Sequence, residues 1–113
     1  MHEMSLCEGI LHVLEEQAVT QRFNKVKAVY LEVGALAGVE VEALRFGFDV
    51  VMKTSIAEDA RLEIINMPGQ AWCMPCMQLV NIKQRFDACP LCGDHKLQVQ
   101  GGEEMRIKEL EVE

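Results

Sequence analysis

The sequence predicts an α+β fold in which two helices pack on a three-stranded sheet and a small lobe is inserted before the last strand. Two segments carry apolar residues at the three- and four-residue spacing of an amphipathic helix. Three others are dense in the aliphatic and β-branched residues that favour strands. Between residues 68 and 102 both patterns weaken, Pro-Gly and Gly-Gly pairs stand at the two ends, and four paired cysteines appear.

The first helix is expected to begin near Ser5. Ser5 followed by Glu8 matches a capping box, in which each side chain satisfies a free backbone amide at a helix start. Apolar residues then recur at helical spacing at Leu6, Ile10, Leu11, Leu14 and Ala18. We therefore expect one face of this helix to be buried, and the residues ahead of Ser5 to pack little, as chain termini commonly do.

Three segments are predicted to form the strands of the sheet. Residues 25–34 and 61–67 are rich in Val, Ile and Leu and are bounded by polar or turn-forming residues. The last segment, 105–113, alternates apolar and polar residues, but its phase slips by one residue near Lys108 and Glu109. A β-bulge in the final strand would explain that slip.

The second helix is predicted over residues 40–52. Its apolar residues repeat at spacings of three and four, and Phe46 and Val50 are expected to widen the apolar stripe. Glu40 and Glu42 fall in the first turn, where carboxylates interact favourably with the positive end of the helix dipole.

The length of 113 residues corresponds to about one domain, so the lobe is expected to interrupt a discontinuous main domain. Residues 1–68 plus 103–113 would form the main α+β domain, and residues 69–102 the inserted lobe. The net charge is -7 and no segment collects basic residues, which argues against nucleic-acid binding. The longest uncharged stretch, residues 64–82, contains prolines and amides, so membrane insertion is not expected. Nothing in the opening residues directs export, and a cytoplasmic location is expected.

The paired cysteines predict a zinc site. Cys73 and Cys76 form one C-x-x-C pair, Cys89 and Cys92 form another, and twelve residues separate the pairs. Each such turn can offer two thiolates at about 2.3 Å from Zn(II), and four thiolates close a tetrahedral structural site. A redox pair or four unligated thiols are the alternatives, but reduced cytosolic thiols in this spacing favour the metal. The lobe is therefore expected to be zinc-ribbon-like and to depend on zinc for folding.

The N-terminus is a candidate nickel site. The Met1 amine, the His2 amide nitrogen and the His2 imidazole can close adjacent five- and six-membered chelate rings, and Glu3 offers another backbone nitrogen or a carboxylate. Ni(II) and Cu(II) favour such nitrogen-rich sets. Taken alone, a histidine at position 2 is more often an incidental polar residue at a frayed terminus.

Three motifs together resemble the HypA/HybF family of hydrogenase nickel-insertion proteins. They are the opening Met-His-Glu-Met-Ser-Leu-Cys, the segment Val-Tyr-Leu-Glu-Val-Gly-Ala-Leu at 29–36 followed by Val39-Glu40, and the four-cysteine frame. The resemblance covers the whole chain. It implies an α+β nickel lobe with a small zinc lobe, nickel at Met1, His2 and Glu3, and structural zinc at the four cysteines.

The resemblance also implies a function and partners. We expect a nickel metallochaperone that binds Ni(II) at its N-terminus and delivers it to the [NiFe] hydrogenase large-subunit precursor, or in some organisms to urease, together with a nickel-handling accessory GTPase. The alternative is a zinc-ribbon docking or regulatory module without a nickel role. His95 could join the nickel site, although exposed hydrogen bonding is the ordinary role of such a residue. No nucleophile with its base, phosphate loop or carboxylate pair is found, so an enzyme is not expected.

Overall fold

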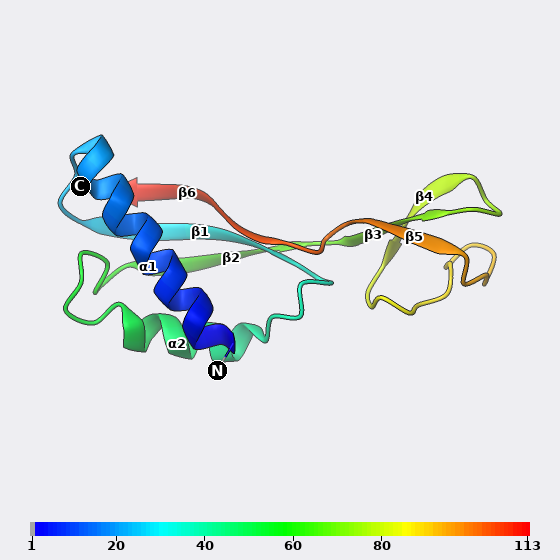
Figure 1. Ribbon diagram of the computed structural model, residues 1–113, viewed down its shortest axis with the longest axis horizontal. Coiled ribbons are helices and arrows are strands. Elements are labelled where there is room, and N and C mark those ends of the chain that lie inside the picture. The colour runs from blue at the N-terminus through cyan, green and yellow to red at the C-terminus, as the bar shows by residue number, and fades with distance from the viewer. Residues whose placement is uncertain (1) are drawn as a thin grey trace. The chain divides into compact units, whose positions relative to one another are not determined.

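The computed structural model describes residues 2–113, and Met1 lies outside the described residues. The elements follow in the order α1 (His2–Gln21), β1 (Val26–Gly34), α2 (Val41–Val51), β2 (Arg61–Met67), β3 (Gly69–Cys73), β4 (Gln78–Ile82), β5 (Leu97–Gly101) and β6 (Met105–Val112) (Figure 1). The strands form two three-stranded sheets, in the orders β2-β1-β6 and β4-β3-β5. The predicted α+β fold is confirmed, with the second sheet contributed by the cysteine-bearing insertion.

The chain divides into two compact units. The helical unit comprises Met1–Leu31, Val39–Ile64 and Ile107–Glu113, and the cysteine unit comprises Glu32–Gly38 and Ile65–Arg106. The cysteine unit takes in the end of β1 because backbone hydrogen bonds hold that end to the segment after β5. The Gly34 N–H donates to the Glu104 carbonyl at 2.9 Å, and the Leu36 N–H donates to the Gly102 carbonyl at 2.7 Å. The expected division at residues 69 and 102 into separately folding domains stays a prediction.

Helix α1 starts earlier than the capping box indicates. It begins at His2, so Ser5 lies inside the helix and the prediction of a start near Ser5 is wrong. The first turn is held by α2: the Glu3 carboxylate accepts a hydrogen bond from the Glu40 N–H, and the Glu3 side chain is only 13% exposed. The expectation that the residues ahead of Ser5 pack little is therefore wrong for Glu3, whereas His2 is exposed as expected.

Helix α2 lies at its predicted position, but its buried face is narrower than predicted. Glu40 is its N-cap, with a side chain that accepts from the N–H groups of the next turn, and Met52 is its C-cap. Phe46 and Val50 are exposed, at 68% and 41%, which contradicts the expectation that they extend the buried face. At about 100° per residue Phe46 points roughly opposite the buried Phe48, so one helix face cannot hold both.

Strands β1, β2 and β6 lie where the sequence predicts them. In β6 the half-buried residues are Met105, Ile107 and Leu110, whereas Lys108 and Glu109 are both exposed. The alternation of half-buried and exposed residues is thus interrupted at the same place as the alternation of apolar and polar residues in the sequence. The bulge that would explain this slip stays a prediction. Strands β3, β4 and β5 were not predicted, because the glycines and cysteine turns around them interrupt the alternation on which strand recognition depends.

The sheet of the cysteine unit is antiparallel throughout. Strand β3 pairs with β4 in the register Gly69↔Ile82 to Cys73↔Gln78, and with β5 as far as Cys73↔Leu97. An irregularity between Gln70 and Ala71 shifts the pairing of β3 with β5. Within the described part of the chain, neither helix is long and apolar enough to cross a membrane.

Candidate metal sites

The structure brings the four paired cysteines together. The sulfur atoms of Cys73, Cys76, Cys89 and Cys92 all lie within 4.8 Å of one another. The Cys73 and Cys92 sulfurs are 3.6 Å apart, and those of Cys76 and Cys89 are 4.0 Å apart. Four thiolates bound tetrahedrally at about 2.3 Å from a zinc ion would stand roughly 3.8 Å from one another. Donor type and spacing therefore fit a structural metal such as zinc.

Each C-x-x-C pair sits in the same kind of turn. The Met77 N–H donates to the Cys73 carbonyl and the Gly93 N–H donates to the Cys89 carbonyl, both at 2.8 Å. The residue after each pair takes a left-handed conformation, with φ of 52° at Met77 and 79° at Gly93. Gly93 adopts it without the steric cost that a side chain carries, while Met77 pays that cost. Two turns of the same form thus present their sulfurs to one point.

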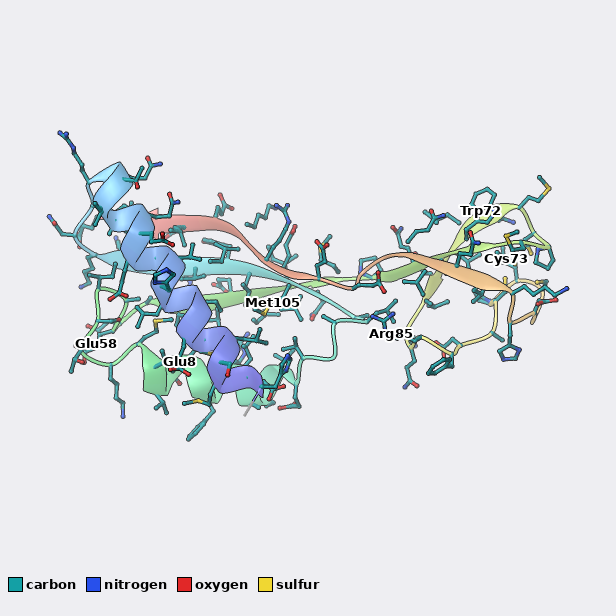
Figure 2. All side chains as sticks on the ribbon, viewed as in Figure 1. Glu8, Glu58, Trp72, Cys73, Arg85 and Met105 are labelled. Atoms are coloured by element: carbon teal, nitrogen blue, oxygen red, sulfur yellow. The ribbon has the colours of Figure 1, made fainter. Side chains whose placement is uncertain are left out.

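Strand β3 leads into the first turn, and backbone hydrogen bonds hold the segment around the second. Cys73 is the last residue of β3 and lies among the clustered sulfurs (Figure 2). The second turn is closed by the Cys89 N–H, which donates to the Asp94 carbonyl at 2.8 Å. The Met74 N–H donates to the Lys96 carbonyl at 3.1 Å and so joins the first turn to the segment leading into β5.

The apolar core beside these turns is small. Buried Cys73 and Cys89 are themselves part of it, and the other buried members are Leu36, Ala71, Val80 and Ile82. Arg85 adds polar contacts, donating to the Glu103 carboxylate at 2.7 Å and to the Leu36 carbonyl at 3.3 Å (Figure 2). So few buried side chains provide little hydrophobic stabilisation, which is the situation in which a bound metal contributes folding free energy.

The surroundings of Cys76 and Cys89 shift the pKa values of these two thiols in opposite directions. Hydrogen bonding with Cys92, together with burial, raises the pKa of Cys76 to about 12. Burial also opposes ionisation of Cys89, but hydrogen bonds from the N–H groups of Cys92 and Leu91, together with those from the Cys73 and Cys92 thiols, outweigh it and lower the pKa of Cys89 to about 7. Leu91 makes its contact directly, because its N–H points at the Cys89 sulfur at 3.4 Å. Cys89 is therefore the thiol most readily present as the thiolate that a metal binds.

The candidate nickel residues lie at the start of α1. The His2 side chain is 58% exposed, and its Nδ1 stands 3.4 Å from Glu3 Oε2. The same Glu3 oxygen accepts the Glu40 N–H at 3.2 Å, and this hydrogen bond is the main cause that lowers the pKa of Glu3. Backbone N–H groups in the first turn of a helix have no acceptor within the helix, so those of His2 and Glu3 need not leave a helical hydrogen bond to bind a metal. Met1, the third predicted ligand, lies outside the described residues.

The other histidines lie elsewhere. His95 is exposed and belongs to the cysteine unit, and its part in a nickel site stays a prediction. His12 is exposed on α1, and its Nε2 lies 3.3 Å from Glu16 Oε1. Sequence reasoning missed the contact of Glu3 with Glu40, because two acidic residues that are far apart in the chain give no pairing signal.

Comparison with known proteins shows the family to which this chain belongs. The family model described as "Hydrogenase/urease nickel incorporation, metallochaperone, hypA" matches residues 1–112. The chain therefore belongs to the HypA family of nickel-incorporation metallochaperones, and the resemblance seen in the sequence is confirmed.

Individual relatives are similar to this chain in sequence over its full length. The chain is 62% identical to "Hydrogenase maturation factor HypA" of Azotobacter chroococcum mcd 1 and 60% identical to the protein of the same name of Alkalilimnicola ehrlichii, each over 113 residues and 100% of both chains. Its fold is similar to the solution structure of the Ni metallochaperone HypA from Helicobacter pylori, with a TM-score of 0.70 at 21% identity, covering 97% of this chain and 96% of that one.

Proposed function

We propose that the chain is a nickel metallochaperone that binds Ni(II) through Met1, His2 and Glu3 and delivers it to the large subunit of [NiFe] hydrogenase during maturation. Membership of a nickel-incorporation family over residues 1–112 is the observation that carries this proposal. The exposed His2 imidazole and the first-turn backbone N–H groups of α1 support the location of the site.

Ligand chemistry supports nickel at this place. The Met1 amine, the His2 amide and the His2 imidazole supply nitrogen donors, which Ni(II) prefers to the oxygen donors favoured by Mg(II) or Mn(II). A terminal site that uses few donors can be dismantled by a competing ligand set. Such a site suits a carrier, because a carrier has to release its ion.

The four cysteines have a separate role in this proposal. They hold Zn(II) as a closed structural site, and the zinc gives residues 69–102 the folding free energy that their small core lacks. We retain residues 1–68 plus 103–113 as the nickel-binding domain. The chain then acts as a carrier with no catalytic residues of its own.

The function requires partners that handle the same ion. We propose a nickel-handling accessory GTPase and the hydrogenase large-subunit precursor as those partners, in the cytoplasm, where the thiols stay reduced. The net charge of -7 suits neither nucleic acid nor an anionic membrane surface.

Nickel binding by two variants tests the proposal. The zinc-loaded parent, His2→Ala and His12→Ala are titrated with Ni(II) at neutral pH by calorimetry and by ligand-field absorption. His12 is the matched control, because it is an exposed histidine on the same helix as His2. We expect His2→Ala to lose stoichiometric binding and His12→Ala to keep it. Binding that is absent in the parent, or that is indifferent to His2, would instead favour a zinc-ribbon docking module.

A further inference from the structure

The four clustered thiols are unequally exposed to solvent. Cys73 and Cys89 are buried, at 0% and 2%, and Cys76 is half-buried, whereas Cys92 is exposed. Cys92 lies between Leu91, which is 63% exposed, and Gly93, where the space that a Cβ would occupy is open. A small solute that approaches the cluster therefore meets Cys92 before the other sulfurs.

The Cys73 sulfur is a close partner for the Cys92 sulfur. Its sulfur lies 3.6 Å from that of Cys73, closer than the 4.0 Å between the Cys76 and Cys89 sulfurs. Cys89 has contacts of its own, with the Cys76 sulfur at 4.0 Å and with the Leu91 N–H. Forming a bond of about 2.05 Å between Cys73 and Cys92 requires their sulfurs to approach by only roughly 1.5 Å.

We propose that Cys92 is an oxidation site, at which a hydroperoxide converts the zinc-bound cluster into a Cys73–Cys92 disulfide and releases the zinc. This inference goes beyond the proposed nickel function and does not depend on it. It depends only on zinc occupying the four cysteines.

The chemistry needs no component besides the hydroperoxide. The Cys92 thiolate attacks the peroxide O–O bond, which breaks to give a sulfenic acid and an alkoxide or hydroxide. The Cys73 thiolate then attacks the Cys92 sulfur and expels hydroxide, forming the disulfide. Two thiolates lose two electrons in total, and the peroxide gains those two electrons.

Loss of two thiolates removes the zinc. Only Cys76 and Cys89 remain as ligands, and two ligands cannot complete the tetrahedral thiolate sphere of a structural zinc site. Because the core of the cysteine unit is small, its strands should loosen when the zinc leaves. A dithiol reductant and fresh zinc should restore the site, because a disulfide is reversible whereas the higher oxidation states are not.

Cys7 supplies an internal comparison. It is fully buried, and its sulfur contacts the Leu44 carbonyl at 3.4 Å in the helical unit. Burial raises the pKa of this thiol, so it holds little of the reactive thiolate. It should remain reduced while the cluster is oxidised.

The test uses the full chain loaded with zinc and purified without oxygen. Hydrogen peroxide is added, zinc release is followed with a chromogenic chelator, and the disulfides are mapped by mass spectrometry. The matched variants are Cys92→His and Cys76→His, since histidine can still ligate zinc at either position. We expect the parent and Cys76→His to release zinc and to show the Cys73–Cys92 linkage. We expect Cys92→His to hold its zinc under the same treatment.

The disulfide map keeps the test decisive if a histidine variant binds zinc poorly. In the parent, a Cys73–Cys92 linkage with Cys7 still reduced supports the proposal. A disulfide that does not join Cys73 to Cys92, such as a Cys76–Cys92 linkage or one within either C-x-x-C pair, overturns it. Sulfinic or sulfonic products without a disulfide, or retention of zinc at full peroxide exposure, overturn it as well. The nickel titration of the parent is unaffected by any of these results, so failure here is distinguishable from failure of the nickel proposal.

Discussion

The carboxylate of Glu3 accepts a hydrogen bond from the backbone N–H of Glu40, with 3.2 Å between the oxygen and the nitrogen. Glu40 in turn caps α2, because its carboxylate accepts from the N–H groups of Glu42 and Ala43 at 3.3 and 2.6 Å. The start of one helix is thereby tied to the cap of the other. Glu3, one of the proposed nickel ligands, thus also has a structural role.

Replacing Glu3 tests that structural role. Glu3→Ala removes the acceptor of the Glu40 N–H, so we expect a lower urea midpoint than in the parent. Glu8→Ala, an exposed acidic position on the same helix, is the control and should change the midpoint little. Equal midpoints for the two variants would show that the Glu3 contact contributes nothing to stability.

Blocking the N-terminal amine tests the proposed chelate. An N-terminal extension turns the Met1 amine into an amide, so nickel binding should be lost, whereas a C-terminal extension should leave it intact. The fold should persist in both proteins, because an extension leaves the Glu3 contact in place and the adjacent His2 is largely exposed. Calorimetry gives the affinities and circular dichroism the fold. Equal nickel affinity with a free and a blocked amine would exclude Met1 as a ligand.

Acidification should remove nickel before zinc. Nickel has to displace protons from the terminal amine, the imidazole and at least one amide, so its affinity should fall steeply below neutral pH. Zinc held by four thiolates in a closed tetrahedral site should persist further, because all four ligand positions are filled by side chains that the fold holds together. Metal content is measured on one sample dialysed stepwise from mildly alkaline to mildly acidic buffer. Zinc leaving first would contradict this order.

Removing zinc should unfold one unit and spare the other. Serine at Cys73 or Cys89, or treatment with a strong chelator, should abolish the zinc content and the dispersed NMR signals of β3, β4 and β5. The signals of α1 and α2 should remain, because their buried residues come from the helical unit. Cys7→Ser is the control, since Cys7 lies outside the cluster. Full zinc content in a Cys73 variant would refute the structural assignment.

Replacement by alanine should have opposite effects on stability at Gly93 and at Gly9. It should destabilise the protein at Gly93, where φ is left-handed, and stabilise it at Gly9. Gly93 has φ of 79° with open space around it, so Gly93→Ala should cost about 1 kcal/mol from backbone strain alone. Gly9 lies inside α1, also with open space, so Gly9→Ala should stabilise by roughly 0.5–1 kcal/mol. Urea unfolding of the zinc-loaded proteins measures both. A neutral Gly93→Ala would mean that the turn relaxes to another conformation.

Most of the helix and strand positions follow from local sequence patterns. The segments 26–34, 41–51 and 61–67 are found within a residue or two of their predicted limits, because apolar spacing along one element reports directly on its own conformation. The cysteine site is similar, because each C-x-x-C pair forms its turn locally. By contrast, β3 to β5 escaped prediction, since short strands between turns carry too few residues to show a period.

The sequence alone determined the family and the four-cysteine frame, and it is the source of the proposal that the N-terminus chelates nickel, because each is a set of residue types at short spacings. Only the tertiary structure decided that α1 begins at His2, that Phe46 faces solvent, and that Cys92 is the exposed thiol beside Cys73. These features depend on contacts between residues far apart in the chain. Local periodicity shows that a helix has an apolar face or that its terminus can be capped. The element that packs against the helix determines which residues are buried and where the helix begins.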